Sequence, residues 1–352
     1  MKMYIRSATC ISAQKTFESD GFLTDIIENT GTRLKPVEPD YSKYIDLKLA
    51  RRMSHIIKMG VAAAKQCLTN ADVEMPGAII TGTAFGCMED TVTFLTRLVE
   101  LNEEMLPPTA FIQSTHNTVA AQIALMLKCH NYNNTFVHKG ISFESAVQDA
   151  WMLLNEGDAN DILVGGIDEM VDTSFKVLTR LGLYKRSPIS NLQLFNTPTS
   201  GTLGGEGAAF FLLNNKPSID NLAEFSGFKT FYGEYDSEAL AQQINTFLSE
   251  HDQHISNIDL VITGRNGDTK NDAVYNDLSI LNNKAQANYK HLSGEYSVSS
   301  SFALWMAANI LNKGVVPEIV VHADLSTQSP KTVLIYNHYQ AKYHSLMLVS
   351  AC

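Results

Sequence analysis

The chain has 352 residues, with 27 Lys plus Arg against 37 Asp plus Glu and a formal net charge of −10. A hydrophobic fraction of 45% with only 18% charged residues allows a large buried core and excludes wholesale disorder. The acidic balance argues against nonspecific nucleic-acid binding, which needs a basic surface. Five cysteines without CxxC spacing exclude a disulfide scaffold and indicate a reducing compartment. Because we find no signal peptide and no membrane span, we expect a cytoplasmic protein.

Helix and strand patterns alternate along the whole length of the chain, which predicts an α/β fold. The expected elements, in order, are a helix over 48–68, a strand over 78–83, a helix through 94–101, a helix over 118–128, a helix over 145–158 and a strand over 161–169. The helix over 118–128 carries small and apolar residues on nearly every side, so we expect it to be buried. The next helix should end at Gly157. The strand over 161–169 is too apolar to be half exposed, so it belongs in a central sheet.

A second, shorter α/β half begins near residue 215, after the polar stretch LNNKPSIDN. Its expected elements are a helix over 237–251, a strand over 258–264, a helix over 302–311 and two strands over 331–337 and 345–351. No low-complexity stretch or long linker separates the halves. We therefore expect 1–214 and 215–352 to be two halves that pack as one body.

Five motifs of this chain carry a family resemblance. They are the helix opened by Arg51-Arg52-Met53, the glycine loop GTAFGCMED (82–90), the segment LPPTAFIQSTHNTVAAQIAL (106–125), the turn and strand EGDANDILVGGIDE (156–169) and the hairpin GTLGGEGAAFFLL (201–213). In this order they resemble the β-ketoacyl synthases, the condensing enzymes of the thiolase-fold superfamily. The resemblance implies a thiolase-like α/β fold, with two packed α/β halves in five layers (αβαβα).

The resemblance also implies where catalytic residues should stand. In that family a cysteine at a strand-to-helix turn is acylated, and two histidines, one supported by a lysine, stabilise the enolate formed on decarboxylation of the extender. At the matching positions this chain has Gly140 for the cysteine, Gly264 for the first histidine and Glu295 for the second, and it keeps Lys290. The family's C-terminal glycine loop is replaced by HYQAKY (338–343). Since glycine carries no nucleophile and an ionised glutamate donates no hydrogen bond, we predict that no catalytic triad is intact. If Glu295 is buried beside Lys290, the pair neutralises itself in a structural role.

A chain that keeps the condensing-enzyme scaffold but not the catalytic residues resembles the chain-length factors of type II polyketide systems. The compact form of the chain resembles the ketosynthase-like proteins of aryl-polyene and flexirubin-type pigment clusters. The resemblance implies a heterodimer with an active ketosynthase paralogue and an acyl carrier protein reached through that partner. It implies no cofactor and no metal. The interface should be formed by 115–125 and 133–140. The candidate interface and tunnel residues are Phe111, Gln113, Ser114, Thr115, His116, Thr118 and His138.

Two other interpretations stay open, an autonomous acyltransferase or hydrolase with a repurposed pocket and an acyl-binding scaffold homodimer. For the first, Ser142 or Ser145 could act as a hydroxyl nucleophile with His138 as its base, although no acidic group to orient the histidine is evident. Cys87 and Cys129 are the candidate thiols, but a free buried cysteine usually packs as a small hydrophobe.

Overall fold

The computed structural model describes residues 2–19, 21–323 and 329–352. Within these ranges one continuous 11-stranded mixed sheet has the order β11-β10-β9-β12-β13-β8-β1-β7-β5-β3-β4. Its strands are β1 (Met3–Ile11), β3 (Ala78–Gly82), β4 (Tyr132–Phe136), β5 (Asp161–Asp168), β7 (Gly207–Asn214), β8 (Ala223–Tyr232), β9 (Leu260–Thr263), β10 (Gln286–Asn288), β11 (Val321–Ala323), β12 (Thr332–Tyr339) and β13 (Tyr343–Ser350). Two short strands, β2 (Thr30–Gly31) and β6 (Ile189–Ser190), pair separately.

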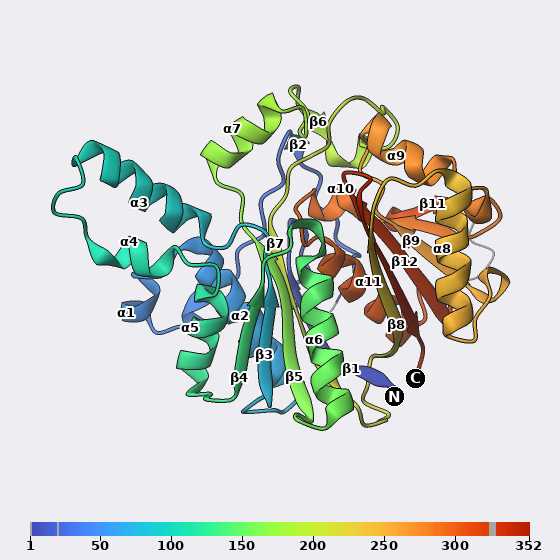
Figure 1. Cartoon of the computed structure of the whole chain (residues 1–352), viewed down its shortest axis with the longest axis horizontal. Helices are drawn as coiled ribbons and strands as arrows, with labels where there is room; N and C mark the ends of the chain where they lie inside the picture. Colours follow the sequence, from blue (N-terminus) through green and yellow to red (C-terminus); the bar gives the residue numbers. More distant parts are fainter. Residues whose placement is uncertain (1, 20, 324–328) are drawn as a thin grey trace.

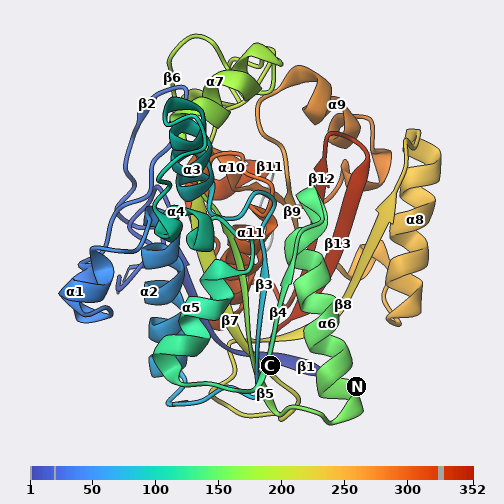
Figure 2. The same ribbon diagram turned by 60° about the vertical axis from the view of Figure 1, so that its left-hand side comes forward.

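The helices cover both faces of each half of this sheet (Figure 1, Figure 2). They are α1 (Leu47–Ala50), α2 (His55–Asn70), α3 (Met88–Glu100), α4 (Pro108–Gln113), α5 (Thr118–Leu127), α6 (Ser142–Glu156), α7 (Asp172–Arg180), α8 (Ser237–Glu250), α9 (Thr269–Asn276), α10 (Lys290–Ser293) and α11 (Ser300–Lys313).

Three hydrophobic clusters define the layers. The largest joins α6 and α11 to β3 and β5 from one half and to β9, β12 and β13 from the other, so these two helices form the central layer. A second cluster packs α2 and α5 on the outer face of the first half, and a third packs α8 and α9 on the outer face of the second half. The predicted five-layer αβαβα arrangement is therefore confirmed.

The boundary expected between residues 214 and 215 falls in the connection from β7 to β8. β1 pairs antiparallel with both of these strands, so the sheet runs on across the boundary. The division into 1–214 and 215–352 stays a prediction.

Two expected helices differ from the structure. The helix expected over 48–68 starts only at His55, because Ser54 has the extended backbone of an N-cap residue and separates α2 from the short α1. The prediction that the helix over 118–128 is buried on nearly every side is wrong for the isolated chain. α5 buries one face, which includes Val119 and Ile123, whereas Leu125 on the other face is 70% exposed. The expected end of α6 at Gly157 is confirmed, since this glycine takes a left-handed conformation with φ 81°.

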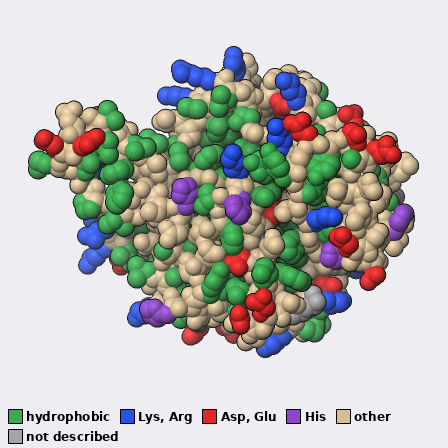
Figure 3. All heavy atoms as spheres, viewed as in Figure 1, with side chains coloured by type: hydrophobic (Ala, Val, Ile, Leu, Met, Phe, Trp, Pro, Cys, Tyr) green, Lys and Arg blue, Asp and Glu red, His purple; other side chains and the backbone are tan. Residues whose placement is uncertain are grey.

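The helices α3 and α4 form an arm that extends away from the sheet (Figure 1). Hydrophobic side chains gather on this arm in Figure 3, and Leu95, Val99, Met105 and Ile112 are among its exposed apolar residues. No helix in the described part of the chain has the length and apolar character needed to cross a bilayer.

Candidate functional site

Gly140 lies in the one-turn segment Lys139–Ile141 that leads from β4 into α6. A Cβ atom added at Gly140 would lie 2.2 Å from the Cβ of Tyr339 and 2.6 Å from its Cγ. Carbon atoms in favourable contact are about 3.5–4.0 Å apart. The Tyr339 side chain, which comes from β12, therefore fills the space that any side chain at position 140 would need.

Gly264 directly follows β9, and the space beside it is also filled by neighbouring side chains. A Cβ atom there would lie 2.1 Å from Oδ1 of Asn337 and 2.5 Å from the hydroxyl of Tyr275. The hydroxyl of Tyr289 donates a hydrogen bond of 3.2 Å to the same Asn337 oxygen. A buried polar cluster thus occupies the space beside Gly264, and no imidazole fits at that position without rearrangement.

Glu295 and Lys290 form an ion pair, so the condition under which the sequence predicted a structural role, that Glu295 lies largely buried beside Lys290, is met. Nζ of Lys290 donates to Oε2 of Glu295 at 2.7 Å, and Nδ2 of Asn266 donates to the same oxygen at 2.7 Å. The Lys290 side chain is 1% exposed and that of Glu295 is 13% exposed. Both charges are therefore neutralised at the place where the family resemblance puts a histidine and its lysine.

A second carboxyl group is buried in the central layer. Glu144 on α6 is 1% exposed, and neither of its side-chain oxygens has a hydrogen-bond partner. Burial raises the pKa of Glu144, and the charge of Lys290 opposes that rise. Lys290 thus interacts electrostatically with two carboxyl groups, and it donates a hydrogen bond only to that of Glu295.

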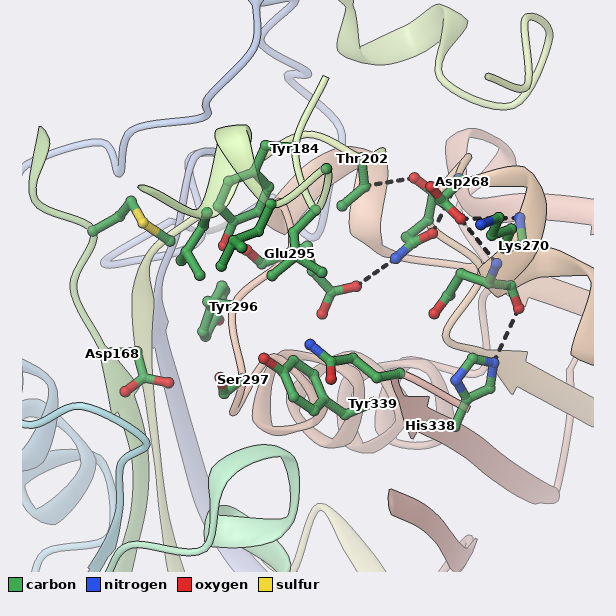
Figure 4. Close-up of a pocket in the computed structure, with 18 of the residues that line it drawn as sticks. Asp168, Tyr184, Thr202, Asp268, Lys270, Glu295, Tyr296, Ser297, His338 and Tyr339 are labelled. Atoms are coloured by element: carbon green, nitrogen blue, oxygen red, sulfur yellow. Dashed lines mark hydrogen bonds between the residues drawn. The ribbon is translucent and has the colours of Figure 1, made fainter. Parts of the chain in front are cut away.

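A cavity of about 380 Å³ opens over Glu295 (Figure 4). Its lining includes Asp168, Glu169, Leu178, Leu181, Leu183, Tyr184, Asn266, Asp268, Lys270, Tyr296, Ser297, His338 and Tyr339. Burial raises the pKa of Asp168 to about 6 and that of Glu169 to about 7. The wall is therefore apolar on the side of α7 and rich in carboxyl groups elsewhere.

The segment expected to replace the glycine loop is the hairpin that joins β12 to β13. Tyr339 pairs with Tyr343, so the loop has three residues, 340–342. Gln340 and Ala341 both have positive φ, as the central residues of a type I′ turn do, and the backbone N–H of Lys342 donates to the carbonyl oxygen of Tyr339. Before the turn, Nε2 of His338 lies 3.1 Å from the carbonyl oxygen of Asn271, and the backbone N–H of Ala341 donates to Nδ1 of His338. Burial lowers the pKa of His338 well below its usual value, so this histidine is neutral. These contacts fix the hairpin and hold Tyr339 over Gly140.

The sequence of the chain is similar to those of known ketosynthases. Residues 32–189 match the sequence profile described as "Beta-ketoacyl synthase, N-terminal domain". A 3-oxoacyl-[acyl-carrier-protein] synthase 2 from Synechocystis is 21% identical over 189 residues, which are 51% of this chain and 45% of that synthase. Residues 32–189 are therefore similar to the N-terminal domain of the β-ketoacyl synthases.

Solved structures of the family share the whole fold. The ishigamide ketosynthase/chain length factor covers 100% of this chain and 99% of its own, with a TM-score of 0.78 at 16% identity. A β-ketoacyl synthase from Burkholderia phymatum gives the same coverage and TM-score at 14% identity. A ketosynthase in complex with its chain length factor from Xenorhabdus doucetiae covers 100% of this chain and 98% of its own, with a TM-score of 0.76 at 15% identity.

The candidate interface residues lie away from the cavity, and none of them lines it. Phe111 and Gln113 are on α4, where the Phe111 ring packs 5.2 Å from that of Phe94 and Gln113 donates to the backbone oxygen of Arg52. Ser114, Thr115 and His116 connect α4 to α5, which starts at Thr118, and His138 follows β4. In the Ser114–Thr118 link the Thr115 and Thr118 hydroxyls are 2.9 Å apart, and His116 lies against Gly86.

The proposed hydroxyl nucleophiles lie outside the cavity as well. Ser142 is buried, and its hydroxyl donates to the carbonyl of Lys139. Ser145 Oγ lies 2.9 Å from Nδ1 of His138, but its hydroxyl also donates to the carbonyl oxygen of Ile141. A serine has only one hydroxyl proton, so in this geometry the histidine donates to the serine instead of acting as its base.

The candidate thiols are also enclosed. Cys87 is fully buried, and its burial raises the pKa of the thiol. Cys129 is 7% exposed, and its Sγ lies 3.7 Å from the carbonyl oxygen of Pro76. Neither cysteine is among the residues that line the cavity.

Sequence reasoning gave no role to Tyr339, His338 or Asn337. Their only signal was the loss of the family's glycines after residue 337. Bulky residues at positions where the family uses glycine indicate that the space above the nucleophile turn is filled, and this signal was available in the sequence.

Proposed function

We propose that the chain is a noncatalytic, chain-length-factor-like subunit that pairs with an active β-ketoacyl synthase in type II polyketide biosynthesis, in the cytoplasm. Within that class we propose a pigment system of the aryl-polyene or flexirubin type. The observation that carries the proposal is the 2.2 Å approach of Tyr339 to the Cβ position of Gly140, because it leaves no room for an acylated side chain.

The charges around the cavity support the same proposal. The condensation reaction of the family would bring the anionic carboxylate of an extender beside the second histidine position. Here that position is Glu295, and Asp168, Glu169 and Asp268 line the same cavity, with Lys270 as the cation among its lining residues. Like charges at close range disfavour binding, and an ionised glutamate cannot stabilise an enolate by donating a hydrogen bond.

An unpaired strand edge supports a partner subunit. β4 is at the end of the sheet and pairs only with β3, so the other side of this strand has free backbone groups. Beside it, Leu125 on α5 is 70% exposed, Val137 is 41% exposed and Phe111 is 56% exposed. The ketosynthase of Xenorhabdus doucetiae is described in complex with its chain length factor, and we propose the same kind of pair here, with the acyl carrier protein recruited through the partner.

Co-expression with an intact ketosynthase paralogue tests the proposal. We expect a 1:1 complex in size-exclusion chromatography and native mass spectrometry, and condensing activity that is lost when this chain is omitted. A homodimer that ignores the ketosynthase would favour the scaffold interpretation. Covalent labelling of the isolated chain by an acyl-thioester probe would favour the autonomous enzyme.

A matched pair of surface variants tests the interface. Leu125→Lys places a charge on the exposed face of α5, and we expect it to abolish the complex while the isolated chain keeps its thermal stability. Ile219→Lys makes the same change at a residue that is 99% exposed, in the connection between β7 and β8, and should leave the complex intact. Equal effects of the two variants would contradict the proposed interface.

The predicted tunnel segment is tested by product length. In the active pair, Thr115→Trp adds volume within Phe111–Thr118, so we expect a shorter product at similar total turnover. Mass spectrometry of the released chains measures this. An unchanged length distribution in an intact complex contradicts a tunnel position for residue 115.

A further inference from the structure

Three residues that line the cavity over Glu295 each carry a buried polar atom without a hydrogen-bond partner: Oδ2 of Asp168, Nδ2 of Asn271 and the hydroxyl of Tyr296. Asp168 and Tyr296 both line the cavity and are each 2% exposed. Oδ1 of Asp168 accepts from the hydroxyl of Thr83 and from the backbone N–H of Ala84, whereas its Oδ2 has no partner. The hydroxyl of Tyr296 has no partner either. A buried polar atom that stays unpaired costs about 1–3 kcal/mol, so a ligand that forms hydrogen bonds with these atoms would be stabilised by them.

The carboxyl groups of the cavity surround this place from several elements. Asp168 ends β5, Glu295 follows α10, and Asp268 precedes α9 (Figure 4). Glu169, which directly follows β5, also lines the cavity. Among the lining residues the opposing cation is Lys270, at the far side of the cavity from Asp168 in Figure 4. The positively charged Lys290 is already paired with Glu295. The free hydrogen-bonding groups of the cavity include donors, because Nδ2 of Asn271, the neighbour of Lys270 in the chain, can only donate. The net charge of the lining nevertheless favours a cation at the end where Asp168 lies.

The remaining wall is apolar. Leu178 on α7 and Leu181 and Leu183 after it line the cavity together with Phe85 and Met170. A volume of about 380 Å³ is within the range of small-molecule sites, which starts at about 300 Å³. Leu181 is 71% exposed in the free chain, so a ligand that covers it would remove apolar surface from water.

We propose that this cavity is a binding site for an amphiphile with an apolar body and a primary ammonium head group. The head donates hydrogen bonds to Oδ2 of Asp168 and to the hydroxyl oxygen of Tyr296, and the apolar body lies against the leucines of α7 and the segment after it. The site belongs to this chain alone. It is independent of the proposed partner ketosynthase and of any condensation chemistry.

Isothermal titration calorimetry of the isolated full chain with n-decylamine and n-decanoate tests the site, because the two probes share an apolar chain and differ in head group. A charge-assisted hydrogen bond predicts that decylamine binds about ten-fold to a hundred-fold more tightly than decanoate. Equal affinities, or tighter binding of decanoate, overturn the proposal.

Three variants locate the binding. Asp168→Asn keeps an oxygen for Thr83 and Ala84 but removes the negative charge, so the affinity for decylamine should fall about ten-fold or more. Asp220→Asn makes the same change at an exposed carboxylate in the connection between β7 and β8 and should change nothing, which controls for attraction of amines to an acidic protein. Ser200→Trp fills the cavity at an exposed lining residue and should abolish binding without involving Asp168. Wild-type affinity in the Ser200→Trp variant, or an equal loss in the two Asp→Asn variants, overturns the proposal.

Discussion

The packing of Tyr339 against Gly140 predicts the cost of a single methyl group. Gly140→Ala adds only the Cβ atom, which would lie 2.2 Å from the Cβ of Tyr339. That neighbour is the atom nearest its own backbone, so it cannot move aside as the end of a flexible side chain could. Overpacking of this kind costs about 1–3 kcal/mol, and the lower entropy of the unfolded alanine chain offsets up to about 1 kcal/mol. We expect a net loss of about 1–2 kcal/mol.

Differential scanning calorimetry measures this loss as a shift in Tm. With about 2.1 cal/mol/K of unfolding entropy per residue, a chain of 352 residues has about 0.7 kcal/mol/K, so Tm should fall by about 1.5–3 °C. Gly31→Ala is the matched control, because a Cβ atom there meets nothing closer than 3.7 Å. Its Tm should stay the same or rise slightly.

A double variant identifies the cause. Tyr339→Gly alone should be strongly destabilising, because it removes a large, largely buried ring. In that background, however, Gly140→Ala should cost less than it does in the native chain, which is a coupling between the two positions. If Gly140→Ala is as stable as Gly31→Ala, or if its cost is unchanged by Tyr339→Gly, then Tyr339 does not fill the space above residue 140.

Three further predictions follow from the buried groups. Glu295→Gln leaves Lys290 charged and 1% exposed without its ion pair, so the unfolding free energy should fall by about 2–4 kcal/mol in denaturant titration. Adding Lys290→Met to the same chain should restore much of this loss. A fully stable Glu295→Gln protein whose complex loses activity would instead indicate a functional role for Glu295. Burial lowers the pKa of His291 from 6.5 to about 4, so the unfolded chain binds a proton below pH 6.5 that the folded chain takes up only near pH 4. The unfolding free energy should therefore decrease by about 3 kcal/mol as the pH falls from above 6.5 to 4. His291→Gln should make that decrease smaller. Iodoacetamide should alkylate the exposed Cys352 before any other cysteine of the native chain, which peptide mass spectrometry measures. Preferential labelling of the buried Cys87 would instead indicate that Cys87 is a reactive nucleophile.

Local patterns were sufficient for most of the secondary structure. The turn at Gly157 followed from the need for a left-handed residue at a helix end, and the central place of β5 followed from its continuous apolar sequence. The burial of α5 was overestimated, because an apolar helix face that is exposed in the isolated chain has the same composition as one that packs in a core. Composition by itself cannot distinguish these two cases.

The sequence by itself determined the α/β scaffold, the resemblance to the β-ketoacyl synthases, and the residue types at 140, 264 and 295, because each of these is carried by local spacing or by an ordered set of motifs. Only the tertiary structure decided what surrounds those positions. Tyr339 from β12 fills the space at Gly140, and Asn337 fills the space at Gly264. Contacts between elements so far apart in the chain depend on how the layers pack, and no local pattern encodes them. The same holds for the cavity, whose unpaired Asp168 oxygen becomes visible only when residues of several elements are brought around it.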